Sequence, residues 1–166
     1  MFQIAVIGND DCQPASQEWQ LAYEIGAKIA TLGALLVCGG GTGIMEAACR
    51  GAKGHGGITL GILPATKKKP VDYLDIQIPT GLDHARNVVV ILSADIIVAI
   101  GGKAGTLSEI CFAWITGRPI IALSAVEGWS ARLAGQCLDD RRTNPIYTAT
   151  TVLEVVQIIE AIRKQC

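Results

Sequence analysis

Charged residues are scarce in this chain of 166 residues, and neither sign prevails among them. They make up 17% of the sequence, against about 25% in an ordinary globular domain, and the formal net charge is −1 at pH 7. Without a basic excess the chain has no global attraction for nucleic acid or an anionic membrane. Because half of the residues are hydrophobic, we expect a sheet covered on both faces and a further face buried against copies of the same chain.

We expect no membrane-spanning run, targeting signal or metal-binding motif in this chain. The longest apolar stretch, residues 88–100, is interrupted by Ser93 and Asp95 and is too short to cross a bilayer. The chain enters a strand pattern directly, without a basic segment, so we expect no signal peptide and a cytoplasmic location. No CxxC pair or zinc-like spacing occurs, so we expect no metal site and mostly buried thiols at Cys12, Cys38, Cys49, Cys111, Cys137 and Cys166.

Short apolar runs alternate with helical patterns along the chain. Strands are predicted at 3–8, 34–38, 58–63, 74–78, 95–100, 120–124 and 146–148. Helices are predicted at 16–32, 44–53, 82–93 and 106–116, with an amphipathic helix from 152 to the end. This alternation predicts an α/β fold: one Rossmann-like domain over residues 1–166, with a doubly wound, mainly parallel sheet and helices on both faces. The run 95–100 is expected to be the central strand.

Two glycine-rich turns are the most specific feature of the sequence. The first is Gly39-Gly40-Gly41-Thr42-Gly43, and the second is Gly101-Gly102-Lys103-Ala104-Gly105-Thr106. Each follows a predicted strand and precedes a predicted helix, an arrangement in which backbone N–H groups and a helix N-terminus face an anion. Two such turns predict one phosphate-bearing ligand between neighbouring strand ends, close to Gly8, Asn9 and Asp10. The alternative is that the glycines serve only tight turns and close packing.

Neither turn has the motif of a common nucleotide-binding site. The spacing departs from G-x-G-x-x-G, and no acidic residue is placed to hold an NAD ribose. The Gly-Lys-Ser/Thr of a P-loop is also missing. We therefore expect neither NAD binding nor P-loop ATP chemistry.

Several side chains near the second turn have two interpretations. Thr106 and Glu109 have the spacing of a capping box with Thr106 as the N-cap, which would explain both residues. Alternatively, the Glu109 carboxylate points across the site, where it binds a ribose hydroxyl or assists the attack of water. Arg86 is either an ion-pair partner or a phosphate clamp. Lys103 either supplies charge to an anion or faces solvent.

Other notable residues receive the simpler interpretation. We expect the run Lys67-Lys68-Lys69 to be a solvated loop, with a flap over an acidic ligand as the alternative. His84 is expected to be a surface or cap histidine rather than a base. Trp114 and Trp129 are expected to serve packing or an interface rather than the stacking of a ligand.

Several motifs, taken in order along the chain, resemble a known superfamily. It is the Rossmann-like superfamily of the LOG ("lonely guy") cytokinin-activating phosphoribohydrolases, once mislabelled lysine decarboxylases. The resemblance spans nearly the whole chain and is closest to a branch that includes the molybdenum cofactor carrier proteins of algae and cyanobacteria. The motifs are Met45-Glu46-Ala47-Ala48, Gly61-Ile62-Leu63-Pro64, Gly81 with Ala85-Arg86-Asn87, and Gly101-Gly102-x-x-Gly105-Thr106-x-x-Glu109-Ile110.

The resemblance implies roles for individual residues. In the hydrolases the motif Pro-Gly-Gly-x-Gly-Thr-x-x-Glu binds phosphate, and its Glu acts with an upstream Arg to cleave an N-glycosidic bond. The matching residues here are Gly101, Gly102, Gly105, Thr106, Glu109 and Arg86. This chain departs from the pattern by Ile100 in place of proline, Lys103-Ala104 in place of a pair ending in tyrosine, and Asn87 in place of lysine. The departures favour an altered pocket that keeps its grip on phosphate.

The sequence therefore predicts a carrier or storage protein for the molybdenum cofactor, an anionic pterin. The alternative is a LOG-type hydrolase of nucleoside 5′-monophosphates that releases free base and ribose 5-phosphate, with Arg86 and Glu109 as its catalytic pair. A third interpretation is a nucleotide-binding oligomer with neither activity. Nothing resembles a pyridoxal-phosphate enzyme, so decarboxylation is not expected.

The resemblance also implies a homodimer or homotetramer, with molybdenum enzymes or cofactor biosynthesis proteins as candidate partners. Ligand binding is predicted at Gly8, Asn9, Asp10, Gly39, Gly40, Gly41, Thr42, Gly43, Met45, Arg86, Asn87, Gly101, Gly102, Lys103, Ala104, Gly105, Thr106 and Glu109.

Overall fold

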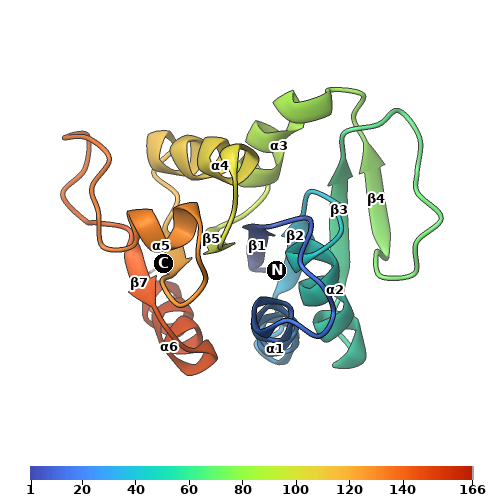
Figure 1. Ribbon diagram of the computed structural model, residues 1–166, viewed down its shortest axis with the longest axis horizontal. Coiled ribbons are helices and arrows are strands. Elements are labelled where there is room, and N and C mark those ends of the chain that lie inside the picture. Colours follow the sequence, from blue (N-terminus) through green and yellow to red (C-terminus); the bar gives the residue numbers. More distant parts are fainter. Residues whose placement is uncertain (166) are drawn as a thin grey trace.

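Seven strands form one sheet in the computed structural model, which describes residues 1–165 (Figure 1). The strands are β1 (Gln3–Gly8), β2 (Leu35–Cys38), β3 (Thr59–Leu63), β4 (Ile76–Pro79), β5 (Ile96–Ile100), β6 (Ile120–Leu123) and β7 (Tyr147–Ala149). Their order is β4-β3-β2-β1-β5-β6-β7, and every neighbouring pair is parallel. The predicted α/β fold is confirmed, but the central strand is β1, and β5 lies beside it.

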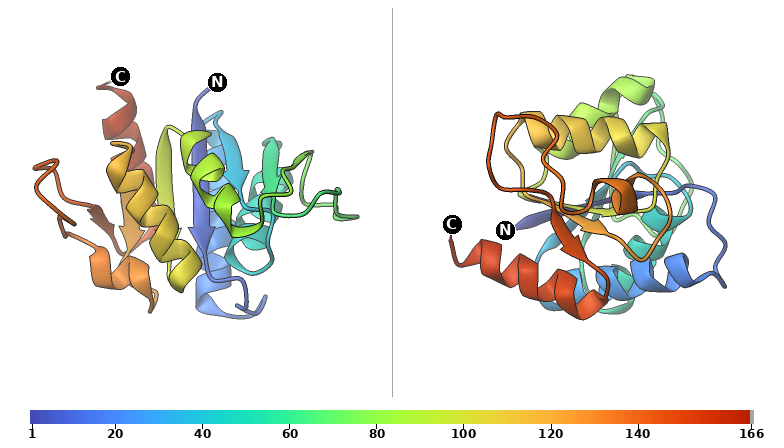
Figure 2. Two further views of the ribbon diagram at one scale, coloured as in Figure 1. Left: turned by 90° about the horizontal axis from the view of Figure 1, so that it is seen from above. Right: turned by 60° about the vertical axis from the view of Figure 1, so that its left-hand side comes forward.

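Helices cover both faces of the sheet (Figure 2). They are α1 (Gln17–Thr31), α2 (Ile44–Gly54), the 3₁₀ turn η1 (Asp83–Arg86), α3 (Asn87–Leu92), α4 (Ala104–Ile115), α5 (Trp129–Leu133) and α6 (Val152–Arg163). One apolar core lies between the sheet and α1, α2 and α6, and a second lies against α3, α4 and α5. Burial on both faces explains why the strands of this sparsely charged chain are almost entirely apolar. In the part of the chain that the structure describes, no helix is long and apolar enough to span a membrane.

The chain reverses its direction of winding at β1. It runs from β1 outward to β4 on one side, then returns to β5 on the other side of β1. Gly8 at the end of β1 is the register partner of Ile100 at the end of β5. The connections that leave these two strands go to opposite sides, and a crevice at such a point is where open α/β sheets bind ligands.

The predicted helix at 82–93 forms as two pieces. The 3₁₀ turn η1 comes first, and α3 begins at Asn87. Asp83 opens η1 with a φ of +48°, a left-handed conformation that Asp adopts more readily than most residues, and Gly81 before it has a φ of +68°. These two positive φ angles reverse the chain after β4 and set the direction of the segment that carries His84 and Arg86.

The capping box predicted at Thr106 and Glu109 is wrong. Helix α4 begins at Ala104, with Lys103 at the N-cap, so Thr106 already lies inside the first turn. Its side chain packs against Gly102, where an added Cβ would lie 2.4 Å from the Thr106 Cβ. A capping box does occur at the last helix, where Thr151 caps α6 and Glu154 reaches back to the N-cap N–H. Glu109 is therefore free of a capping role.

The cysteines described by the structure are all free thiols. Cys12, Cys38 and Cys49 are buried, as expected, whereas Cys111 is half-buried and Cys137 is exposed. Cys166 lies outside the described residues. Among residues 1–165, no group of three or more His, Cys, Asp or Glu side chains is arranged to hold a metal ion.

Candidate functional site

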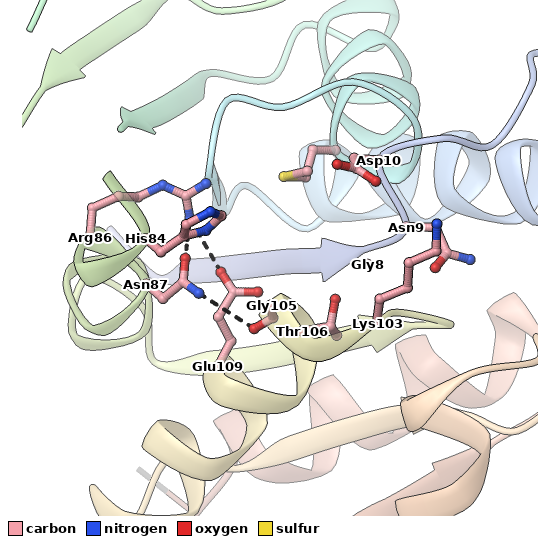
Figure 3. A pocket seen from close by; sticks show the side chains of 11 residues that line it. Gly8, Asn9, Asp10, His84, Arg86, Asn87, Lys103, Gly105, Thr106 and Glu109 are labelled. Atoms are coloured by element: carbon pink, nitrogen blue, oxygen red, sulfur yellow. Dashed lines mark hydrogen bonds and ion pairs between the residues drawn. The ribbon is translucent and has the colours of Figure 1, made fainter. Parts of the chain in front are cut away.

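A pocket of about 200 Å³ opens where the strand order reverses (Figure 3). Its wall combines the loop after β1, the start of α2, the η1–α3 segment and the start of α4. The lining residues are Gly8, Asn9, Asp10, Met45, His84, Arg86, Asn87, Lys103, Gly105, Thr106 and Glu109. Segments that are far apart in the sequence thus contribute polar side chains to one cavity.

Asn9 ties the loop after β1 to both glycine turns. Its side-chain Oδ1 accepts a hydrogen bond from the N–H of Gly102 at 2.8 Å, and its Nδ2 donates to Glu18 at 3.1 Å. Its backbone carbonyl accepts from the N–H of Ile44, the first residue of α2, at 2.8 Å. The bonds to Gly102 and Ile44 hold the starts of α4 and α2 beside the end of β1, and the bond to Glu18 adds a tie to α1.

The N-terminus of α4 opens into the pocket. No side chain among the described residues caps this helix, so N–H groups of its first turn remain available. Space is open at Gly105. Apart from its chain neighbours and the backbone of its own helix, no atom of the described residues would lie within 4 Å of a Cβ added there. Lys103 stands at the rim and pairs with Asp11, with Nζ 2.6 Å from Oδ2. A positive helix end with free N–H groups and a nearby lysine favours an anion.

Arg86 and Glu109 form a buried pair on the opposite side of the pocket (Figure 3). Arg86 Nη1 lies 3.5 Å from Glu109 Oε1, and the two side chains are only 13% and 9% exposed. Arg86 Nη1 also donates to Asn87 Oδ1 at 2.7 Å, while Asn87 Nδ2 donates to Ser108 Oγ at 2.8 Å. Asn87 thus connects α3 to α4 and orients the guanidinium. The Nε of Arg86 is buried without a hydrogen-bond partner among residues 1–165.

The environment of Glu109 changes its acidity. Burial raises the pKa of its carboxyl to about 7, although the positive charge of Arg86 opposes this shift. Desolvation disfavours the charged form of a carboxyl, and a single guanidinium at 3.5 Å compensates only in part. A carboxyl that is partly protonated near neutral pH can accept or donate a proton, which is the property required of an acid–base catalyst.

The first glycine turn (39–43) does not line this pocket. Gly39 lies directly behind Arg86, because a Cβ added there would be 2.5 Å from Nη2. A Cβ at Gly41 would lie 2.4 Å from Cε of Met45, and one at Gly43 would lie 2.4 Å from the carbonyl oxygen of Asn9. The turn supports the residues that face the ligand space.

A neighbouring loop also holds the first turn. Lys69 Nζ donates to the carbonyl of Gly40 at 2.9 Å, and the N–H of Gly40 points at Cys38 Sγ at 3.3 Å. Lys67 and Lys68 are exposed, as expected for a solvated loop, but Lys69 is half-buried. The lysine that touches the glycine turn binds its backbone and does not extend over the pocket.

The structure brings together most of the predicted ligand-binding residues, but not all of them. Those in the pocket wall are Gly8, Asn9, Asp10, Met45, Arg86, Asn87, Lys103, Gly105, Thr106 and Glu109. Those outside the wall are Gly39, Gly40, Gly41, Thr42, Gly43, Gly101, Gly102 and Ala104. His84 also lines the pocket and was absent from the predicted set; its place two residues before Arg86 was the available signal.

Comparisons with known proteins agree with this architecture. The SLOG cluster4 family matches residues 1–156, and the chain belongs to this family. The molybdenum cofactor binding protein from Rippkaea orientalis is 34% identical, with a TM-score of 0.84 over 97% of this chain and 96% of that one. The molybdenum cofactor carrier protein of Chlamydomonas reinhardtii is 29% identical, with a TM-score of 0.86 over 99% of both chains.

A hydrolase is also among the relatives. The cytokinin riboside 5′-monophosphate phosphoribohydrolase of Mycobacterium tuberculosis is 31% identical over 160 residues, which cover 89% of this chain and 84% of that protein. The resemblance to the LOG-like superfamily and to its molybdenum cofactor carrier branch is therefore confirmed.

Proposed function

We propose that this protein binds the molybdenum cofactor and stores or carries it in the cytoplasm. The observation that carries the proposal is the open, uncapped N-terminus of α4, which faces Arg86 across a pocket at the switch point of the sheet. The likeness to the two molybdenum cofactor proteins supports the choice of cargo, because it extends over nearly the whole chain. Molybdenum enzymes or proteins of cofactor biosynthesis would be the partners in its delivery.

The terminal phosphate of the cargo would lie on the first turn of α4. The N–H groups of Gly105 and Thr106 and the Thr106 hydroxyl would donate hydrogen bonds to it, and Lys103 and Arg86 would supply positive charge. Lys103 is exposed and would exchange its ion pair with Asp11 for the phosphate. Arg86 retains an unpaired N–H, so its hydrogen-bonding capacity is not exhausted by Glu109 and Asn87.

The test is a titration of the isolated molybdenum cofactor without oxygen, followed by measurement of its lifetime in air. We expect saturable binding and a longer lifetime than in buffer. Arg86→Gln should weaken binding at least tenfold, since it removes a charge-assisted contact. Arg141→Gln is the matched control, because Arg141 forms an exposed ion pair with Asp139 away from the pocket. Absence of both binding and protection would contradict the proposal.

A second candidate is favoured by Glu109 itself. A buried carboxyl with a pKa of about 7 beside an arginine suits acid–base catalysis, as in hydrolysis of the N-glycosidic bond of a nucleoside 5′-monophosphate. Incubation with AMP and with cytokinin nucleotides tests this activity through the release of free base. We expect little release, because Ile100, Lys103-Ala104 and Asn87 depart from the hydrolase motif. Turnover typical of a hydrolase, abolished in Glu109→Gln, would replace the carrier proposal.

We further propose that the protein associates with itself through the outer face of α3 and α4. Leu92 and Ile115, at the ends of these adjacent helices, are 51% and 56% exposed. Large apolar side chains on neighbouring surface helices favour burial against a partner. The double variant Leu92→Lys, Ile115→Lys should have a smaller molar mass in light scattering than the wild type. The control Leu153→Lys, at an exposed position on α6, should have the molar mass of the wild type.

A further inference from the structure

A second hollow lies on the other side of the second glycine turn (101–106). Its volume is about 500 Å³, and its wall includes Gly102, Glu127, Trp129 and Arg132. Asn9 and Lys103 line both this hollow and the pocket described above. The turn therefore lies between two neighbouring spaces that share Asn9 and Lys103 in their walls, and a ligand that occupied both would pass over Lys103.

The pocket alone is small for the proposed cargo. Sites for cofactors and drug-sized ligands usually measure about 300–1,000 Å³, and the pocket has about 200 Å³. This space suits a phosphate with the carbon atoms next to it. The ring system of the cargo must then lie outside the pocket, and the hollow beyond Lys103 offers the larger neighbouring space.

The hollow has a fixed aromatic wall. Gly128 has a φ of +136°, and a Cβ added there would lie 2.6 Å from the Gly101 carbonyl carbon, so this backbone packs directly on the second turn. The N–H of Trp129 then donates to the carbonyl of Gly102 at 3.1 Å. Arg132, which is exposed, lies over the Trp129 ring with its Cζ 5.2 Å from the ring centroid. A planar ring with delocalised electrons can stack on this guanidinium or replace it on the indole.

The hollow also contains a carboxylate without a partner. The Glu127 side chain is exposed and makes no hydrogen bond or ion pair with any residue in 1–165, whereas Glu18 accepts from Asn9. A carboxylate accepts two parallel hydrogen bonds from neighbouring N–H donors. The 2-amino-4-oxopyrimidine edge of a pterin presents such a pair, the amino group and the adjacent ring N–H. The Watson–Crick edge of adenine presents one donor beside an acceptor.

We propose that the hollow between Trp129 and Glu127 is a subsite for the pterin ring. The ring stacks on Trp129 and Arg132 and donates its paired N–H groups to Glu127, while the phosphate lies on α4 beyond Lys103. This inference rests on the proposed function and adds to it the residues that select a pterin over an adenine nucleotide. It also assigns Trp129 a role in ligand stacking that the sequence did not predict.

The experiment compares three probes: neopterin monophosphate, AMP and inorganic phosphate. Their binding is measured by calorimetry on the wild type and on Glu127→Gln, Trp129→Leu and Trp129→Phe. We expect Glu127→Gln and Trp129→Leu to weaken neopterin monophosphate about tenfold and to leave inorganic phosphate unchanged. Trp129→Phe should retain most of the affinity, since it keeps a stacking surface. Glu127→Gln should leave AMP unaffected, and Glu160→Gln, at an exposed position on α6, is the matched control.

The outcomes separate this inference from the proposed function. Suppose that the wild type binds the molybdenum cofactor, but that Glu127→Gln and Trp129→Leu bind neopterin monophosphate as tightly as the wild type does. This result would overturn the proposed subsite and leave the proposed function standing. A wild type that binds neither the cofactor nor neopterin monophosphate would overturn both proposals. Trp129→Leu could perturb α5, so its far-ultraviolet circular dichroism is compared with the wild type. Glu127→Gln changes only an exposed side chain, and its result decides the inference even if Trp129→Leu fails to fold.

Discussion

The two glycine turns resemble each other in sequence but have different structural roles. The second turn (101–106) contributes Lys103, Gly105 and Thr106 to the pocket wall, and its other face lines the adjoining hollow. The first turn (39–43) contributes nothing to that wall and packs against the residues that do. Glycine indicates close approach of other atoms, and those atoms can belong to a ligand or to the protein itself.

The surroundings of single glycines make this difference concrete. At Gly39, Gly41 and Gly43 an added Cβ would meet Arg86, Met45 and the backbone of Asn9 at 2.6 Å or less. At Gly105 it would meet open space. The first turn therefore uses its glycines to admit protein atoms. The second turn does the same at Gly101 and Gly102, where an added Cβ would lie 2.7 Å from Asn9 Nδ2 and 2.4 Å from Thr106 Cβ, but at Gly105 it keeps space free beside a helix N-terminus.

The largest effect is expected from Gly43→Ala in the first turn. Gly43 has a φ of +61°, and the new Cβ would press on the carbonyl oxygen of Asn9 that accepts the hydrogen bond from Ile44. Strain and the clash should together lower the free energy of unfolding by about 2–4 kcal/mol, measured by urea denaturation. Gly33→Ala is the matched control, because Gly33 has a φ of +67° with no contact within 4 Å, and it should lose about 1 kcal/mol. Equal losses would mean that the first turn is not closely packed.

Glu109→Gln tests the raised pKa of the buried carboxyl on α4, the helix that follows the second turn. The folded pKa of about 7 lies above the ordinary value of 4.5, so the folded state binds more protons than the unfolded state between these values. The free energy of unfolding of the wild type should therefore fall as pH rises from 4.5 to 7 and should change no further from this group above pH 7.

The variant has no carboxyl at this position and should lack that part of the pH dependence. At pH 8 it should be more stable than the wild type by about 1–3 kcal/mol, measured by urea denaturation at several pH values. Identical pH dependence in the two proteins would show that Glu109 has an ordinary pKa.

Gly105→Ala should separate binding from stability at the second turn. The new methyl group projects into open space beside the first turn of α4, so it should not disturb the fold. Alanine also favours the helix, and the free energy of unfolding should stay equal or rise by up to about 1 kcal/mol. Binding of neopterin monophosphate should weaken about tenfold in calorimetry, because the methyl group fills the place of the phosphate. Unchanged affinity would place the phosphate elsewhere.

The smallest effect is expected from Gly39→Ala. Gly39 of the first turn lies behind Arg86, and Arg86 pairs with Glu109 on the helix that follows the second turn. The new Cβ would displace the guanidinium of Arg86, the far end of a flexible side chain, so the fold should lose little stability. Since the charge of Arg86 lowers the pKa of Glu109, its displacement should raise that pKa further above 7. Carbon-13 NMR titration of the glutamate carboxyls measures the change. An unchanged Glu109 pKa would mean that the first turn does not position Arg86.

Local patterns were sufficient to predict most elements of the fold. Period-2 and period-3.6 hydrophobicity located the strands and the longer helices within a few residues, since burial on one or both faces leaves that periodicity in the chain. The short helix α5 (Trp129–Leu133) was not predicted. The ends of α1 are also marked by local residues. Ser16 is its N-cap, and Gly33, which has a positive φ, follows its C-terminal end. The start of α4 was mispredicted: the helix begins at Ala104, two residues before Thr106, whose side chain packs against Gly102 and caps nothing.

The sequence by itself determined the alternation of strands and helices, the parallel sheet and the membership of a superfamily. These follow from the periodic burial of apolar residues and from motifs that are contiguous in the chain. Only the tertiary structure decided that β5 returns beside β1, which brings Asn9 next to Gly102 and Arg86 next to Glu109. It also decided which turn faces the pocket and how far Glu109 is desolvated. Both depend on atoms from distant segments, whose positions no local pattern encodes.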